Sequence, residues 1–393
     1  MKKILGMSLA LAMLLTLLTG CGGGTTSAST APSGSPTDSS AQAPSGDPIK
    51  IAVAAPMTGD NAEYGQGFQN AAQMMVDQWN SDGGVLGRPI ELVSYDDKNS
   101  SDEAASIAQK IVSEGDIVGV IGHFSSGVCL TAAPVYQQNK IIEISPSASN
   151  PKYSEIGDYI FRNNTVISVE AQAALDIATK DLGKKNIGIL AIKTDWGTST
   201  EQIVQQLVTD NYPDAKVVDV EEVLENSDDY SSAITKLDKA GTDVLICVSM
   251  YSTLAPVAIQ YKQVNPDIQI VGFSNAYSQQ LVELGGAAVE GVCLPVIFFA
   301  GSDNADIKSY VDEYTQKYGS APSALTSQAY DSVGMLLEAI KQAGTTDQPA
   351  LRDALAKIEY KGVTGNTKFD EKNNVTKDFV KLTIKDGKFV EMK

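Results

Sequence analysis

Histidine is almost absent from this chain, and its scarcity excludes several kinds of site. The only histidine is His123, so histidine-rich metal sites and most imidazole acid–base schemes are excluded. No GxGxxG segment follows a predicted strand and no GxxxxGK[ST] segment occurs, which argues against nucleotide sites. Ser125 and Ser126 lack the upstream glycine of a GxSxG nucleophile elbow. We interpret His123 as a loop or packing residue of this turn. Asp96-Asp97 is interpreted as a solvated strand end, because adjacent residues on a strand point to opposite faces. We therefore expect neither an enzyme nor a metal or cofactor site.

Basic residues are also few. Lysine and arginine total 30 against 48 aspartates and glutamates, which gives a formal net charge of −18. Nucleic-acid binding depends on cationic side chains at phosphates, so we expect no nucleic-acid partner. The negative charge fits solubility at a crowded surface.

Cysteine is rare, with four in the chain and no Cys-x-x-Cys pair. Cys21 lies near the start, and Cys129, Cys247 and Cys293 remain. An odd number argues against a complete disulfide framework. Cys247 and Cys293 lie in apolar runs, so we expect them to be small buried hydrophobic residues.

The N-terminus reads as an export signal. A basic start, Met1–Lys3, precedes an apolar run, residues 4–18, that is too short to span a membrane comfortably. Leu18-Thr19-Gly20-Cys21 then resembles a lipobox, in which the cysteine is acylated; an ordinary signal peptide is the alternative. We expect a signal peptide at 1–20 and a lipidated, Gly/Ser-rich flexible tether at 21–47, which would hold the protein on the outer face of the cell membrane or in the periplasm.

Two strands in the middle of the chain run into small polar loops. Residues 117–121 predict a buried strand, and a helix should follow from about Gly127 to Gln138. The next strand, Lys140 to Ile144, leads into Ser145-Pro146-Ser147-Ala148-Ser149. Parallel strands end at the same edge of a sheet, where ligands bind in open α/β folds. The helix start between them suits a carboxylate.

These loops resemble those of a known family. Gly122-His123-Phe124-Ser125-Ser126 and Ile144 to Ser149 are similar to the paired ligand loops of leucine/isoleucine/valine-binding proteins, which are type I periplasmic binding proteins of ABC importers. Residues 54–59 with Tyr64-Gly65 resemble the family's first loop, and residues 80–87 its next turn. The resemblance covers roughly Pro48 to the C-terminus.

The remaining pattern alternates strands and helices, which predicts an α/β protein with parallel sheets. Among its elements are predicted strands at residues 49–55, 216–223 and 244–248 and a first helix from Gly67 to Asn80. About 345 residues of globular chain favour two domains. The resemblance implies two doubly wound parallel-sheet domains joined by three crossover segments. It places residues 48–164 and 293–366 in the N-terminal lobe and residues 165–292 and 367–393 in the C-terminal lobe.

The resemblance also implies a set of ligand-binding residues. Ser126 matches the position that holds a ligand carboxylate, Ser149 a threonine that bridges carboxylate and ammonium, and Ser147 a backbone contact. Tyr64 and Trp196 match aromatic lid residues, one on each lobe. The full expected set is Tyr64, Ser125, Ser126, Ser147, Ala148, Ser149, Trp196, Tyr251 and Ser274.

One position departs from the family pattern. Where branched-chain amino acid binders place a glutamate for the ligand ammonium, this chain has Ser274. Because a desolvated ammonium needs an anionic partner or several acceptors, either Asp195, Asp331 or another acid substitutes, or the ligand is not a standard α-amino acid. The disulfide of the family's first domain also has no counterpart, since no cysteine lies in residues 95–102.

The expected function follows from this resemblance. We expect the solute-binding component of an ABC importer that captures a branched-chain or other small amino acid and presents it to permease subunits. A binder of an amide, urea or aromatic acid, or a ligand-sensing receptor module, remains the alternative. A surface hydrolase is disfavoured by the single histidine.

Overall fold

The computed structural model describes residues 44–392. The expected signal peptide, Cys21 and most of the tether lie outside the described residues. Within 44–392, no helix combines the length and the apolar character that crossing a membrane requires.

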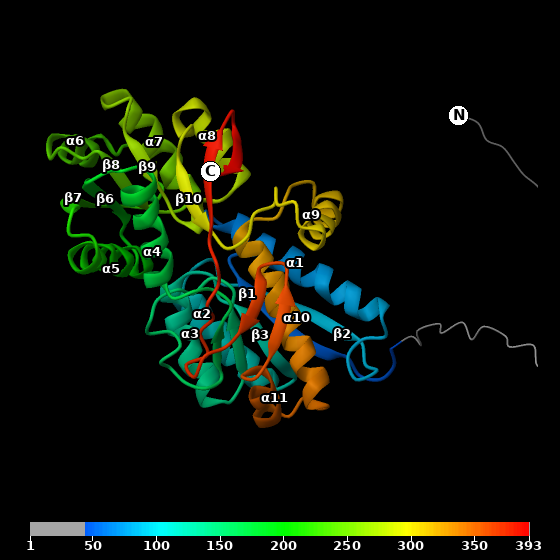
Figure 1. The fold of residues 1–393 in the computed structure, drawn as a ribbon. Helices are drawn as coiled ribbons and strands as arrows, with labels where there is room; N and C mark the ends of the chain where they lie inside the picture. Colours follow the sequence, from blue (N-terminus) through cyan, green and yellow to red (C-terminus); the bar gives the residue numbers. More distant parts are fainter. Residues whose placement is uncertain (1–43, 393) are drawn as a thin grey trace, which may run out of the picture. The chain divides into compact units, whose positions relative to one another are not determined.

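A first sheet of five parallel strands is built from residues 49–162 (Figure 1). Its spatial order is β2-β1-β3-β4-β5. The strands are β1 (Ile49–Ala55), β2 (Ile90–Asp96), β3 (Ile117–Gly122), β4 (Ile142–Ser145) and β5 (Ile160–Arg162). Every residue of β4 is buried and only one residue of β3 is not, as expected for strands covered on both faces.

Helices from two stretches of the chain, 62–138 and 305–355, belong to the same part of the molecule as this sheet. They are α1 (Ala62–Ser81), α2 (Ser101–Glu114), α3 (Ser126–Gln138), α9 (Ala305–Tyr318), α10 (Ala324–Ala343) and α11 (Gln348–Leu355). Helices α1 and α10 pack against each other, and α2 packs against α3 (Figure 1). A small hairpin of β11 (Glu359–Gly362) and β12 (Gly365–Lys368) completes this group, which we call the first lobe.

A second sheet has the order β14-β13-β10-β9-β8-β6-β7. Its parallel strands are β6 (Asn186–Ile192), β7 (Lys216–Val223), β8 (Val244–Val248), β9 (Gln269–Val271) and β10 (Cys293–Val296). Strands β13 (Val380–Lys385) and β14 (Lys388–Glu391) add an antiparallel edge. Its helices are α4 (Ile167–Asp176), α5 (Asp195–Asn211), α6 (Ser231–Lys239), α7 (Tyr251–Val264) and α8 (Gln279–Gly285). We call this group the second lobe.

The sequence pattern predicts these elements closely. The α/β class with two parallel sheets is confirmed, and the strands predicted at 49–55, 216–223 and 244–248 have the observed bounds. Cys247 and Cys293 are buried thiols, as predicted. The pattern misses α8 and the β11–β12 hairpin, and it starts α1 at Gly67, five residues late.

Gly65 explains why the predicted start of α1 lies too late in the sequence. A methyl group at this position would lie 1.9 Å from the carbonyl oxygen of Pro56. Glycine weakens helices, so Tyr64-Gly65 reads as loop, although here glycine lets the helix approach the preceding loop.

The sheets correct two expected lobe limits. The limit at Cys293 would place β10 in the N-terminal lobe, but β10 pairs with β9 and β13 of the second sheet. The limit at 367 also fails, because Asn373 donates to the carbonyl of Ile160 at 3.2 Å and Phe369 packs on Phe161. The chain therefore returns to the first lobe after Val296 and leaves it again only after residue 377.

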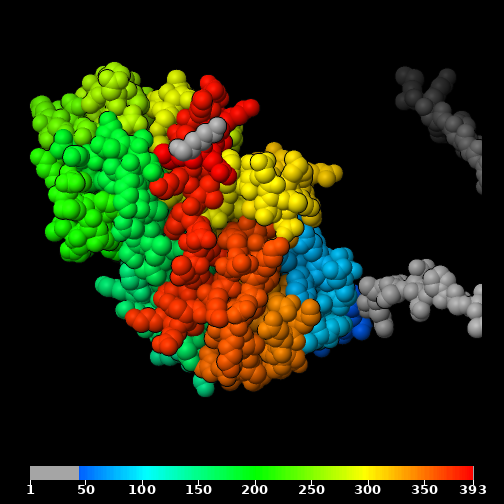
Figure 2. Space-filling view, viewed as in Figure 1, coloured from blue at the N-terminus to red at the C-terminus, as the bar shows by residue number. Residues whose placement is uncertain are grey.

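This last crossing is held by a buried lysine. Lys377 Nζ donates to the hydroxyls of Thr364 and Thr367, each at 2.7 Å. Burial lowers the pKa of Lys377 to about 8, and the Asp331 carboxylate opposes that shift. Figure 2 shows the C-terminal residues in red, passing from the orange helices to the terminal hairpin on this face.

We expect Asp331→Ala to destabilise the first lobe strongly. Asp331 accepts hydrogen bonds from the backbone N–H groups of Val363 and Thr364, so its loss leaves these donors and Lys377 buried without an anion. The free energy of unfolding should fall by about 3–5 kcal/mol in urea titrations. Asp312→Ala, on the exposed face of α9, is the matched control. A change for Asp331→Ala as small as that of the control would contradict this role.

Candidate ligand-binding site

A cavity of about 200 Å³ lies between loops of the two lobes. This volume is below the roughly 300–1,000 Å³ of pockets for drug-sized molecules, so it suits a small ligand. The first lobe lines it with Asn99, Ser101, Phe124, Ser125, Ser126, Gly127, Val128 and Ser147, and the second with Thr194, Asp195, Trp196, Glu225, Met250 and Asn275. Most of these residues follow the carboxyl ends of parallel strands, where α/β folds bind ligands.

The N-terminus of α3 forms one wall and is not capped by a side chain. Ser125 occupies the cap position, but its hydroxyl pairs with the Asn99 side chain instead of the helix. The first turn of α3 contains no acidic residue. Free N–H groups and the positive end of the helix dipole therefore remain available at the cavity, and an anionic group such as a carboxylate satisfies both.

The hydroxyl of Ser126 joins the two ligand loops of the first lobe. Its oxygen accepts hydrogen bonds from the N–H groups of Ser149 and Asn150, both at 3.3 Å. The buried guanidinium of Arg162 donates to the carbonyls of Ala148 and Asn150 from the other side. The backbone around Ser149 is thus fixed before any ligand binds.

The second lobe supplies an aromatic and apolar wall. Trp196, in the first turn of α5, is 4% exposed and meets the ring of Phe273 edge-on at 6.0 Å. Thr194 caps α5 by accepting from the N–H of Gly197 at 3.0 Å, which fixes the turn that carries Trp196. Met250, which precedes α7, adds flexible apolar surface.

Direct contacts link the lobes around the cavity. The hydroxyl of Tyr64 donates to the carbonyl of Asn275 at 2.7 Å, and the Tyr64 ring stacks on Phe124. The Asp195 carboxylate lies so close to Gly127 that a methyl group there would be 2.4 Å from Oδ2. The lobes are therefore drawn together over the cavity in this structure.

Four of the nine expected binding residues line this cavity: Ser125, Ser126, Ser147 and Trp196. The other five lie behind its wall or beside it. Tyr64 reaches Asn275, Ala148 and Ser149 form the buried loop under Ser126, and Tyr251 lines a separate depression beside Glu63. Contact of any of the nine with a ligand stays a prediction.

Ser274 is engaged away from the cavity. Its N–H donates at 2.6 Å to the buried carboxylate of Glu170, while the next residue, Asn275, lines the cavity. Asp331, one expected substitute for the missing family glutamate, is buried in the first lobe against residues 363–364 and cannot serve. Asp195, the other, does line the cavity.

Several residues that line the cavity were not predicted from the sequence. Glu225, Asn99 and Asn275 belong to loops that follow β7, β2 and β9, and Met250 follows β8. Their position after a strand was the available signal. The loop after β7 contains three acids, Glu225, Asp228 and Asp229, so the sequence alone does not single out Glu225.

His123 is a packing residue, as expected. Its Nδ1 lies 2.6 Å from the Asp97 carboxylate and its Nε2 lies 3.2 Å from the Tyr136 hydroxyl, with all three side chains buried. Asp96-Asp97 was expected to be a solvated strand end, which is wrong for Asp97. The imidazole needs a buried acceptor, and Asp97 supplies it.

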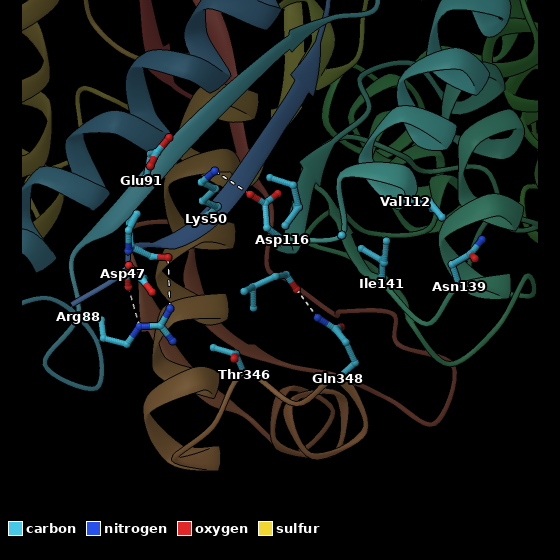
Figure 3. Close-up of a pocket in the computed structure, with 14 residues that line it drawn as sticks. Asp47, Lys50, Arg88, Glu91, Val112, Asp116, Asn139, Ile141, Thr346 and Gln348 are labelled. Atoms are coloured by element: carbon cyan, nitrogen blue, oxygen red, sulfur yellow. Dashed lines mark hydrogen bonds and ion pairs between the residues drawn. The ribbon is translucent and has the colours of Figure 1, made fainter.

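A larger depression, of about 860 Å³, lies at the opposite edge of the first sheet (Figure 3). Both of its basic side chains are already engaged: Lys50 Nζ lies 2.7 Å from Asp116, and Arg88 Nε donates to the backbone carbonyl of Asp47 at 2.7 Å. It adjoins the amino ends of the strands, away from the α3 terminus. These features favour the smaller cavity between the lobes as the ligand site.

Comparison with known sequences identifies a family match. Residues 48–388 match the family described as periplasmic binding protein. A leucine-, isoleucine-, valine-, threonine- and alanine-binding protein of Pseudomonas aeruginosa is 29% identical over 329 residues, which cover 83% of this chain and 87% of the relative. A Leu/Ile/Val-binding protein homolog of Brucella abortus is 30% identical over 329 residues, or 82% of this chain and 86% of the relative.

Solved structures agree with these relatives. A branched-chain amino acid transporter substrate-binding protein from Streptococcus pneumoniae, in complex with isoleucine, superimposes with a TM-score of 0.81 at 26% identity, covering 88% of this chain and 100% of that one. A solute-binding protein from Rhodopseudomonas palustris, in complex with benzoate, shares the fold with a TM-score of 0.80 at 20% identity, covering 88% and 96%.

Glu170 should make stability depend on pH. Burial raises the pKa of Glu170 to about 7, and the N–H of Ser274 opposes that shift. Because the folded-state pKa is raised, the stabilisation is complete below about pH 4.3 and is lost as the pH rises through about 7. Glu170→Gln keeps an oxygen that accepts from the N–H of Ser274 but no longer titrates. Between pH 5 and 8 the unfolding free energy of this variant should therefore fall by on the order of 2 kcal/mol less than that of the wild type.

Urea titrations at a series of pH values measure this slope. Glu283→Gln, at an exposed position of α8, is the control and should keep the wild-type slope. Equal slopes in the wild type and Glu170→Gln would show that Glu170 is ionised throughout.

Proposed function

Because the chain belongs to the periplasmic binding protein family, we propose that it is the extracytoplasmic solute-binding component of an ABC importer. Its ligand would be a branched-chain or other small amino acid, held in the cavity between the lobes. The observation that carries this proposal is the uncapped N-terminus of α3, which faces that cavity beside Ser126 and opposite Trp196.

The relatives support the choice of ligand. Those from Pseudomonas aeruginosa and Brucella abortus are named for binding leucine, isoleucine and valine, and the Streptococcus pneumoniae structure contains isoleucine. A carboxylate would sit at the α3 terminus, and the side chain would lie against Trp196, Phe124, Val128 and Met250. Permease subunits are then the expected protein partners.

The proposed mechanism is closure of the lobes around the ligand. The first lobe offers a site fixed in advance by Ser126 and Arg162, so the ligand docks there first. Trp196 and Asn275 of the second lobe then cover it and exclude water, which strengthens each hydrogen bond inside. The ligand shifts the population because it contacts both lobes only in the closed form.

Binding without catalysis is part of the proposal. The imidazole of His123 is buried between Asp97 and Tyr136, and no second histidine exists to activate Ser125 or Ser126. A binder of an amide, urea or aromatic acid is the second candidate, because Ser274 replaces the ammonium-binding glutamate of branched-chain binders. A sensory module of the same fold would bind the same ligands but require a receptor partner.

The chain's two tryptophans provide a direct test of ligand binding. Trp79 lies in α1 outside the cavity, so Trp79→Phe leaves Trp196 as the sole indole reporter of the site. Titrating this variant with amino acids, amides, urea and aromatic acids should change Trp196 emission only for true ligands. If none of these solutes changes the emission or the melting temperature, the proposed function is wrong.

Trp196→Ala should weaken binding of the amino acid found in that screen by at least about tenfold. The buried indole supplies a large rigid contact area in a closing cleft, and burying an aromatic side chain is worth about 1.5–3 kcal/mol. Calorimetry measures the affinity, and Trp79→Ala is the control that should leave it unchanged. An affinity equal to that of the wild type would remove Trp196 from the site.

Membrane attachment through Cys21 is a further part of the proposal, supported by the lipobox-like Leu18–Cys21 segment. Acyl chains on Cys21 would anchor an otherwise water-soluble protein. Cys21→Ser should therefore move the protein from the membrane fraction to the aqueous fraction, measured by fractionation and immunoblotting. Cys129→Ser, at a buried thiol, should leave it in the membrane fraction.

A further inference from the structure

Glu225 differs from the other groups that line the cavity. One of its carboxylate oxygens, Oε1, is buried and has no hydrogen-bond partner within the described part of the chain. A buried charged oxygen without a partner is costly, so a native protein keeps one where something else binds it. Glu225 also lines the cavity, so a ligand bound there would lie next to its carboxyl group.

The charges around the cavity indicate what kind of group it is. Among the described residues, no lysine, arginine or histidine lines the cavity, whereas two carboxylates do, Asp195 and Glu225. Burial raises the pKa of Glu225, and the Asp60 carboxylate raises it further. Protein cations do not neutralise Glu225, and a positively charged ligand group would do so.

Asp195 has a structural explanation that Glu225 lacks. Asp195 lies in the first turn of α5, next to the Thr194 cap, where the helix dipole favours a negative charge. Glu225 lies in the loop between β7 and α6, beyond the regular strand. Its neighbour Asn226 holds this loop to the first lobe by donating to Asp60 at 3.1 Å.

The groups that would bind an anion and a cation come from different lobes. The uncapped α3 terminus and Ser126 provide donors for an anion in the first lobe. Glu225 provides the acceptor for a cation in the second lobe. A zwitterion satisfies both, whereas a simple carboxylic acid leaves Glu225 without a partner and adds a second acidic group to the same cavity.

We propose that Glu225 binds the ammonium group of the ligand and makes the cavity select zwitterionic amino compounds over carboxylic acids that lack a positive charge. This inference rests on the proposed solute-binding function. The acid that binds the ligand ammonium would then come from the loop after β7. Glu225 would take the place of the glutamate that branched-chain binders have at the position of Ser274.

Paired ligands of the same shape test the assignment. Calorimetry compares leucine with 4-methylpentanoate and isoleucine with 3-methylpentanoate, since each pair differs only in the amino group. Benzoate is added as an aromatic acid. Wild-type protein should bind the better amino acid about 100-fold more tightly than its deaminated partner, the value of a charge-assisted contact in a dry site.

Glu225→Gln preserves the shape of the side chain and removes its charge. It should lower amino-acid affinity about 10- to 100-fold and leave binding of the deaminated acid unchanged or stronger. Asp228→Asn, at an exposed position of the same loop, should behave like the wild type. Melting temperatures within a few degrees of the wild type show that each variant is folded.

The outcomes separate the inference from the proposed function. Amino-acid binding that Glu225→Gln does not weaken overturns the role of Glu225 and leaves solute binding intact. Equal affinity of the wild type for an amino acid and its deaminated partner, or for benzoate, also overturns it. Failure of the wild type to bind any of the five probes overturns both the amino-acid ligand and this contact.

Discussion

The first-lobe half of the site depends on one hydroxyl group, that of Ser126. It accepts two backbone hydrogen bonds from the loop after β4, and so joins two loops that are separate in sequence. Arg162 supports the same loop from beneath through the carbonyls of Ala148 and Asn150. With the loops fixed, the free N–H groups at the start of α3 keep a constant direction toward the cavity. A ligand then pays little to order this half of the site.

The second lobe contributes different chemistry from a different set of strand ends. Trp196 supplies apolar area, Thr194 fixes its turn, and Glu225 adds an acidic side chain to the cavity wall. Neither lobe alone satisfies a molecule with two charged groups. In the proposed function, specificity and closure would therefore depend on the same contacts, because a ligand would complete its hydrogen bonds only when both lobes touch it.

The sequence predicts the fold better than the site. Buried strands such as Val244–Val248 are short apolar runs between polar loops, a local pattern that sequence periodicity detects. Gly65 misled the helix prediction because its reason is a close approach to Pro56, which is a tertiary contact. Ser126 and Trp196 were found through family resemblance. Glu225 was not found, since only the folded loop distinguishes it from the neighbouring acids.

The chain passes between the two sheets three times, after Arg162, after Val296 and after Lys377. Two lobes joined by a single connecting segment can twist and slide as well as bend. Three connecting segments leave chiefly one bending axis, since other displacements of the lobes stretch at least one segment. Such a joint has few configurations to lose on closing. The buried Lys377 anchors the third connecting segment at its first-lobe end. If the lobes close as proposed, this segment would help to set the axis about which they rotate.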